Sequence, residues 1–99
     1  MTSLLCRNRV KDFSRWKAIF ASHAQAHRDA GLQLQGLWRA VEDPNNVFFL
    51  FEVTDASLAR AFIANPTAAE AAQASGVRSA VSLCLVPQHL NHVGEGLLV

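Results

Sequence analysis

Segment 47–53 is apolar along almost its whole length, and Glu52 is its only ionisable side chain. A strand with one face in water alternates apolar and polar residues, whereas this segment is apolar at both alternating sets of positions. It follows residues 43–46 (Asp-Pro-Asn-Asn), a composition typical of turns, and it precedes residues 54–55 (Thr-Asp), which can cap a helix. The pattern predicts a central strand that needs a covering layer on both faces.

Residues 12–30 show the period of an amphipathic helix, with Asp12 as the predicted N-cap and Gly31 as the predicted C-terminal stop. Successive helical residues are separated by about 100°, so the buried side can be drawn around Trp16. Besides Asp12, the residues within about 60° of Trp16 are Phe13, Ile19, Phe20, His23, His27 and Ala30. A single long helix lying on a sheet is therefore expected, with both of these histidines near the centre of its dry side.

Three further strands and a second helical region complete the pattern. Residues 3–9 and 77–86 read as strands, and residues 32–41 alternate between apolar and polar side chains. In the alternating strand, one face is predicted to carry Leu32, Leu34, Trp38 and Ala40, and the other Gln33, Gln35 and Arg39. A second helix is expected from Asp55, with an interruption at Pro66 and an alanine-rich continuation that ends at Gly76.

The order strand, helix, strand, strand, helix, strand predicts a ferredoxin-like βαββαβ fold, an α+β antiparallel sheet with the helices on one face. This domain is predicted to span residues 1–86. The opposite face then carries large apolar side chains, each of which forgoes roughly 1.5–3 kcal/mol if it stays in water. A second copy packed sheet against sheet is the simplest cover, so a homodimer through the open face is expected. Residues 87–99 form a tail with an apolar end, which favours an arm packed on the partner subunit.

Composition fits one folded domain and narrows the range of partners. The 99 residues carry a net charge of +1, and their nine Lys and Arg residues are scattered, which argues against nucleic acid. No apolar run approaches the ~18–20 residues of a membrane span and no signal-peptide pattern opens the chain, so a cytoplasmic location is expected. In that setting Cys6 and Cys84 read as reduced core residues rather than a disulfide or ligand pair.

His23 and His27 are the sharpest candidates for chemistry, because a spacing of four residues puts both on one side of the first helix. Three interpretations remain open. The imidazoles are neutral core residues bonded to backbone or water, or they face a pocket in which one of them transfers a proton near neutral pH. In the third interpretation they bind a metal, and a third ligand must come from Cys6, Cys84, Glu52, His89 or His92, none of which is placed there by spacing.

Short segments at turns and helix starts carry a family resemblance. They are residues 10–13 (Val-Lys-Asp-Phe) with Trp16, residues 30–31 (Ala-Gly), residues 53–55 (Val-Thr-Asp) with Ala61-Phe62, and residues 75–77 (Ser-Gly-Val). On these segments the chain resembles, over about residues 3–86, the dimeric α+β barrel superfamily and within it the antibiotic-biosynthesis-monooxygenase-like domains. The resemblance implies a ligand site between the sheet and the helices. The Asn, Trp and His set of the haem-degrading members does not occur in matching order, so haem chemistry is not expected.

Two functions fit these observations. In the first, the protein is similar to cofactor-free monooxygenases, isomerases or lyases, and it holds an apolar, aromatic or polycyclic molecule with Trp16, Phe20 and Trp38. His23 or His27 then takes or gives a proton, and no bound cofactor or metal is required. In the second, the protein is a non-catalytic homodimeric binding or structural module whose histidines only fill the core. An enclosed space beside the two histidines favours the first function over the second.

Overall fold

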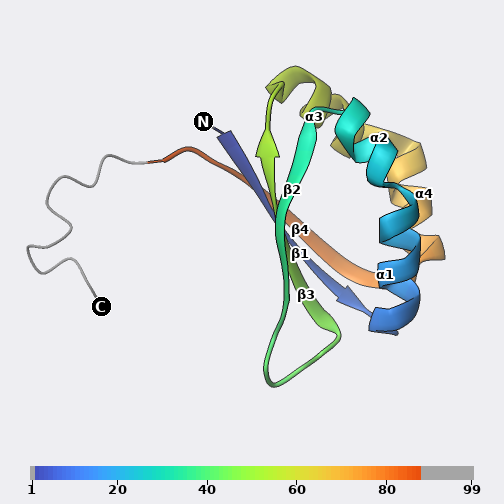
Figure 1. Cartoon of the computed structure of the whole chain (residues 1–99). Helices are drawn as coiled ribbons and strands as arrows, with labels where there is room; N and C mark the ends of the chain where they lie inside the picture. The colour runs from blue at the N-terminus through green and yellow to red at the C-terminus, as the bar shows by residue number, and fades with distance from the viewer. Residues whose placement is uncertain (1, 88–99) are drawn as a thin grey trace, which may run out of the picture.

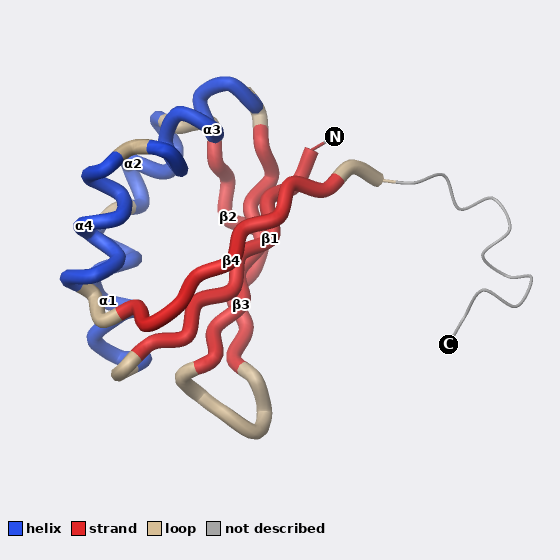
Figure 2. The backbone as a smooth tube through the Cα atoms, turned by 180° about the vertical axis from the view of Figure 1, so that it is seen from behind, coloured by secondary structure: helices blue, strands red, loops and turns tan. Residues whose placement is uncertain are grey.

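The computed structural model describes residues 2–87, which form a four-stranded antiparallel sheet with helices on one side (Figure 1). The strands lie in the order β2-β3-β1-β4, so β3 and β1 are central and β2 and β4 are the edges. Seen from behind, all the helices stand on the same side of the sheet, and no described element covers its other face (Figure 2). The predicted ferredoxin-like α+β fold is confirmed. The predicted tail lies, from residue 88 on, outside the described residues.

The elements follow the predicted order, with each helical region divided in two. They are β1 (Thr2–Val10), α1 (Phe13–Ser22), α2 (Ala24–Asp29), β2 (Leu32–Arg39), β3 (Asn46–Val53), α3 (Ala56–Ala64), α4 (Pro66–Ala74) and β4 (Val77–Leu85). Asp12 and Asp55 cap α1 and α3 as predicted, because their side chains accept hydrogen bonds from backbone N–H groups of the first turn. Gly31 and Gly76 adopt positive φ, 76° and 86°, immediately beyond α2 and α4, where glycine avoids a steric penalty.

The first helical region is interrupted at His23, so the prediction of one continuous helix is wrong. α1 ends at Ser22, His23 has φ −96° and ψ 10°, and α2 begins with the next residue. The hydroxyl of Ser22 donates to the carbonyl of Ile19, a local side-chain bond of the kind that bends helices. The backbone of His23 still bonds to both sides, because its N–H donates to Phe20 and its carbonyl accepts from His27. The break is therefore a bend rather than a separation.

Strand β2 departs from simple alternation in its middle. Its register against β3 shifts between Leu34 and Gly36, which leaves Gln35 as the extra residue of a β-bulge. Because side chains alternate along a strand, the bulge exchanges the two faces: Leu37 lies on the helix side and Trp38 on the opposite face. The indole of Trp38 lies across Gly36, where a Cβ atom would overlap the ring. The prediction that Leu34 and Trp38 share a face is therefore wrong.

The core lies between the helices and the sheet. Along β3 the alternation is regular, with every second residue buried on the helix side and the residues between them half-buried on the other face. The buried apolar residues are Leu4, Cys6, Val10, Trp16, Ala30, Leu32, Val47, Phe49, Phe51, Val53 and Ala59. The cysteines differ: Cys6 belongs to this core as expected, whereas Cys84 is exposed on the edge strand β4, which corrects that expectation. No helix within residues 2–87 combines the length and apolarity that a membrane crossing requires.

Candidate functional site

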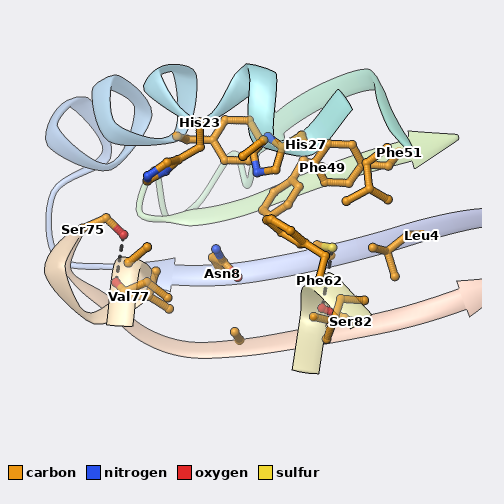
Figure 3. Close-up of a pocket in the computed structure, with 18 of the residues that line it drawn as sticks. Leu4, Asn8, His23, His27, Phe49, Phe51, Phe62, Ser75, Val77 and Ser82 are labelled. Carbon is orange, nitrogen blue, oxygen red and sulfur yellow. Dashed lines mark hydrogen bonds between the residues drawn. The ribbon is translucent and has the colours of Figure 1, made fainter. Parts of the chain in front are cut away.

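A cavity of about 500 Å³ lies between the helices and the sheet. Every helix and strand of the described chain contributes at least one lining residue, and most of those side chains are apolar. The volume lies within the range of small-molecule sites. Figure 3 shows its labelled residues: His23 and His27 come from the helical side, and Phe49, Phe51, Leu4 and Asn8 come from the strands below them. A partly enclosed cavity therefore lies beside the two histidines.

Aromatic rings form one wall of the cavity. The ring of Trp16 stacks on Phe20 with centroids 4.7 Å apart, and Phe49 contacts both rings at 5.6 Å and 5.0 Å. Trp16 is buried at the centre of α1 because its position faces β3 across the core, as the helical period predicts. These tilted and stacked rings give the cavity an apolar, aromatic wall, which suits an apolar ligand. Trp16 and Phe20 therefore both lie where the sequence predicts a ligand-binding role.

His27 is surrounded by aromatic rings rather than by charges. Its imidazole lies 4.9 Å from the ring of Phe20, 5.2 Å from Phe51 and 5.6 Å from Phe62, measured between centroids. Burial lowers the pKa of His27 below its ordinary value of 6.5, and the charge of the nearby His23 lowers it further. Among residues 2–87, no side chain or backbone group is hydrogen-bonded to this imidazole. His27 is therefore a neutral base at pH 7 whose lone pair is available to a ligand.

His23 lies at the bend between α1 and α2 and is half-buried. Its side chain points from the helical side toward the sheet at the end of the cavity that also holds Asn8 (Figure 3). The bend keeps both imidazoles on the cavity, as the spacing of four residues predicts for a continuous helix. The two predicted catalytic candidates are therefore brought together by the structure, but they have different surroundings.

Two polar residues of the cavity, Asn8 and Ser82, were not singled out in the sequence. Asn8 lies on the helix side of β1, because it alternates with the buried residues Leu4, Cys6 and Val10. Ser82 of β4 donates a hydrogen bond to the Sγ atom of Cys6 at 3.6 Å. Burial raises the pKa of the Cys6 thiol, so it stays protonated at neutral pH, although the Ser82 bond opposes this effect. The sequence signal that could have identified Asn8 is a polar residue at a position that alternates with apolar ones.

Other predicted site residues do not meet at the cavity. Trp38 lies on the opposite face of the sheet because of the β2 bulge, so the structure does not bring it to Trp16 and Phe20. Of the third metal ligands considered, Glu52 also lies on that opposite face, and His89 and His92 fall outside the described residues. Within residues 2–87, no group of three potential ligands is close enough together to hold a metal ion.

The fold is that of the antibiotic-biosynthesis-monooxygenase-like proteins. One solved structure with this fold is SnoaB, a cofactor-independent oxygenase from Streptomyces nogalater, with 17% identity and a TM-score of 0.70 over 92% of this chain and 96% of that one. An antibiotic biosynthesis monooxygenase matches with 14% identity and a TM-score of 0.66 over 90% of this chain and all of that one. An uncharacterised NIPSNAP domain protein from Burkholderia xenovorans matches with 18% identity and a TM-score of 0.61, over 89% and 95% of the two chains. No protein-family model and no curated protein matches the sequence.

Proposed function

We propose that this protein binds an apolar, aromatic or polycyclic small molecule in the cavity beneath α1 and α2, and that His27 accepts a proton from it. The observation that carries the proposal is a cavity of about 500 Å³ that is lined by aromatic rings and contains an imidazole without a hydrogen-bond partner among the described residues. The imidazole of His27 is half-buried, so its nitrogens gain a partner only from water or from a ligand in the cavity. A ligand that donates a proton or a hydrogen bond to His27 supplies one.

The aromatic surroundings of His27 suit it to the role of a general base. A base must be unprotonated before it reacts, and the lowered pKa of His27 keeps it so throughout the neutral range. The influences on the pKa of His27, burial first and then the charge of His23, both disfavour its protonated form. His27 is therefore best suited to accept a proton from an acidic O–H or C–H group, such as a phenol or a carbon beside a carbonyl. The protonated imidazole then stabilises the resulting anion.

A role in oxygenation is supported by the similarity in fold to SnoaB, which is described as a cofactor-independent oxygenase. Removal of a proton from an aromatic substrate raises its electron density, so the anion reacts more readily with dioxygen. The same proton transfer also serves an isomerase or a lyase. We propose a cofactor-free reaction of this kind, with His23 as a second proton-transfer group at the other end of the cavity.

The proposed functional unit is a homodimer formed through the open face of the sheet. On that face Trp38 is 53% exposed, Leu83 52%, and Val81 and Leu85 43% each. Large contiguous apolar patches on a protein surface mark interaction sites. A second copy buries these side chains and leaves the cavity, which lies on the other side of each sheet, accessible to its ligand.

The test uses 2-tetralone, an apolar bicyclic ketone with acidic C–H groups beside its carbonyl. Binding is followed through quenching of Trp16 fluorescence in a Trp38→Phe background, and proton abstraction through exchange of the acidic hydrogens in D₂O by NMR. We expect the protein to accelerate exchange beyond free imidazole at equal concentration. His27→Phe, which keeps an aromatic ring but removes the base, should lower the acceleration at least about tenfold with little loss of binding.

His23→Phe is the matched comparison, because it makes the same chemical change at the other imidazole. Binding without accelerated exchange would refute the catalytic role of His27 and favour the second candidate, a non-catalytic binding module. Absence of binding, with His27→Phe more stable than the wild type, would refute the ligand site itself and leave both histidines as core residues.

A further inference from the structure

The face of the sheet away from the helices, here called the open face, carries the cations Arg7 and Arg9 and the anion Glu52 on a largely apolar surface. Strand register assigns its residues, because directly paired side chains lie on the same side. Its apolar members are Leu5, Trp38, Phe48, Leu50, Val81, Leu83 and Leu85. Arg7 lies among them, directly between Phe48 and Val81, and Glu52 lies opposite Ser3 nearer the other end of the same strands.

Two polar atoms on this face have no hydrogen-bond partner within the described part of the subunit. Among residues 2–87, two buried side-chain polar atoms have no hydrogen-bond partner, the Nε atom of Arg7 and the Oδ1 atom of Asn46. Both belong to the open face, since Asn46 pairs with Arg9 one step along from the Arg7–Phe48 pair. A partly desolvated guanidinium without a counter-charge is unfavourable. The Nε atom is already closed off within the subunit, so a counter-charge on a covering surface would meet the terminal nitrogens of the Arg7 guanidinium.

Arg7 and Glu52 are too far apart to pair with each other within one subunit. The register runs from Ser3–Glu52 through Leu5–Leu50 to Arg7–Phe48, so the two charges are separated by four residues along the strands, or roughly 13 Å. The Leu5–Leu50 pair lies midway between them. A two-fold axis that lies in the plane between two facing sheets and passes over this pair places each Arg7 opposite the Glu52 of the other copy.

We propose that a second copy of this chain docks on the open face and that Arg7 of each subunit forms an ion pair with Glu52 of the partner subunit. The inference rests on the homodimer proposed above and adds what fixes its register. The surface is complementary to itself: an apolar centre at Leu5 and Leu50 is flanked on one side by Arg7, with Arg9 beyond it, and on the other by Glu52. An apolar interface alone allows sheets to slide, whereas two reciprocal ion pairs select one arrangement.

The test reverses the charge of Arg7 and of Glu52 in separate variants and then mixes the two variants. Arg7→Glu makes every cross-subunit pair in its own dimer Glu–Glu, and Glu52→Arg makes every such pair Arg–Arg. We expect the wild type to sediment as a dimer in the micromolar range and each variant to have a dissociation constant raised at least about tenfold. An equimolar mixture of the two variants restores opposite charges at both contacts, so it should again sediment as a dimer, now a heterodimer. Arg15→Glu, on the exposed side of α1, is the control with the same change in charge.

Recovery in the mixture also shows that both variants are folded. A dimeric wild type whose variants fail to recover on mixing would overturn the Arg7–Glu52 pairing while leaving the homodimer intact. A monomeric wild type would overturn both, as expected if an acidic protein of another kind covers this face. An unchanged dimer in Arg7→Glu would likewise exclude the ion pair.

Discussion

Ala72→Leu is expected to stabilise the protein and to weaken ligand binding at the same time. Ala72 lies in α4, is half-buried and lines the cavity. Leucine adds three carbon atoms, and burying each contributes about 0.8 kcal/mol when it enters space that is otherwise empty. Because the site is only partly enclosed, we expect a gain of about 1–2 kcal/mol in the free energy of unfolding. A domain of this size then unfolds at a temperature raised by roughly 4–15 °C.

Ala74→Leu is the matched control, because it adds the same atoms to the same helix at an exposed position that does not line the cavity. Both variants carry the same small difference in helix propensity, so their difference isolates the filling of the cavity. Stability is measured by urea unfolding followed by circular dichroism, and binding by titration with 2-tetralone. The filled variant should bind at least tenfold more weakly, whereas the control should bind as the wild type does.

A loss of stability in Ala72→Leu would refute this reasoning. Added side chains that have no room force their neighbours out of favourable rotamers, which costs about 1–3 kcal/mol. Such a loss would show that the helices close onto the sheet in solution, so that no ligand-sized space exists. Close packing of that kind is what the non-catalytic alternative requires.

Three further predictions follow from individual contacts. Burial and then His23 lower the pKa of His27 below 6.5, so the unfolded chain binds more protons than the folded one just below that pH. The free energy of unfolding should therefore fall as the pH drops from about 6.5 to the lowered pKa, and His27→Phe should flatten this slope in urea titrations. The Oδ1 atom of Asn45 accepts from the N–H of Phe13 and its Nδ2 atom donates to the carbonyl of Lys11, which ties the β2–β3 hairpin to the start of α1. Asn45→Ala should therefore destabilise the fold by about 1–3 kcal/mol in the same assay, and an unchanged unfolding midpoint would contradict this. Asp55→Ala should cost about 1 kcal/mol through loss of the α3 cap, and Asp55→Asn should restore most of it.

The positions of the elements follow from local features that a single sequence displays. Asp12 and Asp55 start helices because their side chains replace missing backbone partners, and Gly31 and Gly76 end them because they adopt positive φ. The apolar residues of segment 47–53 predict a central strand, because a strand that is apolar on both faces needs a covering layer on each of them. These signals depend on neighbours within a few residues, so the fold and four residues of the candidate site, Trp16, Phe20, His23 and His27, could be predicted.

The features that were missed depend on contacts between distant segments. Gly36 is compatible with a bulge beside Gln35, but the shift of register itself arises from how β2 pairs with β3. That shift carries Trp38 away from the cavity. The bend at His23 is the exception, because it involves a local bond from Ser22 to Ile19 that a helical pattern does not display.

The sequence by itself thus determined which residues form strands and helices and which side of each is apolar, because period and capping are local properties of the chain. Only the tertiary structure decided that the helices stand clear of the sheet around His27, and that Asn8 and Ser82 join it from β1 and β4. A cavity is space enclosed by elements far apart in the sequence, so its size depends on how those elements pack rather than on any one of them.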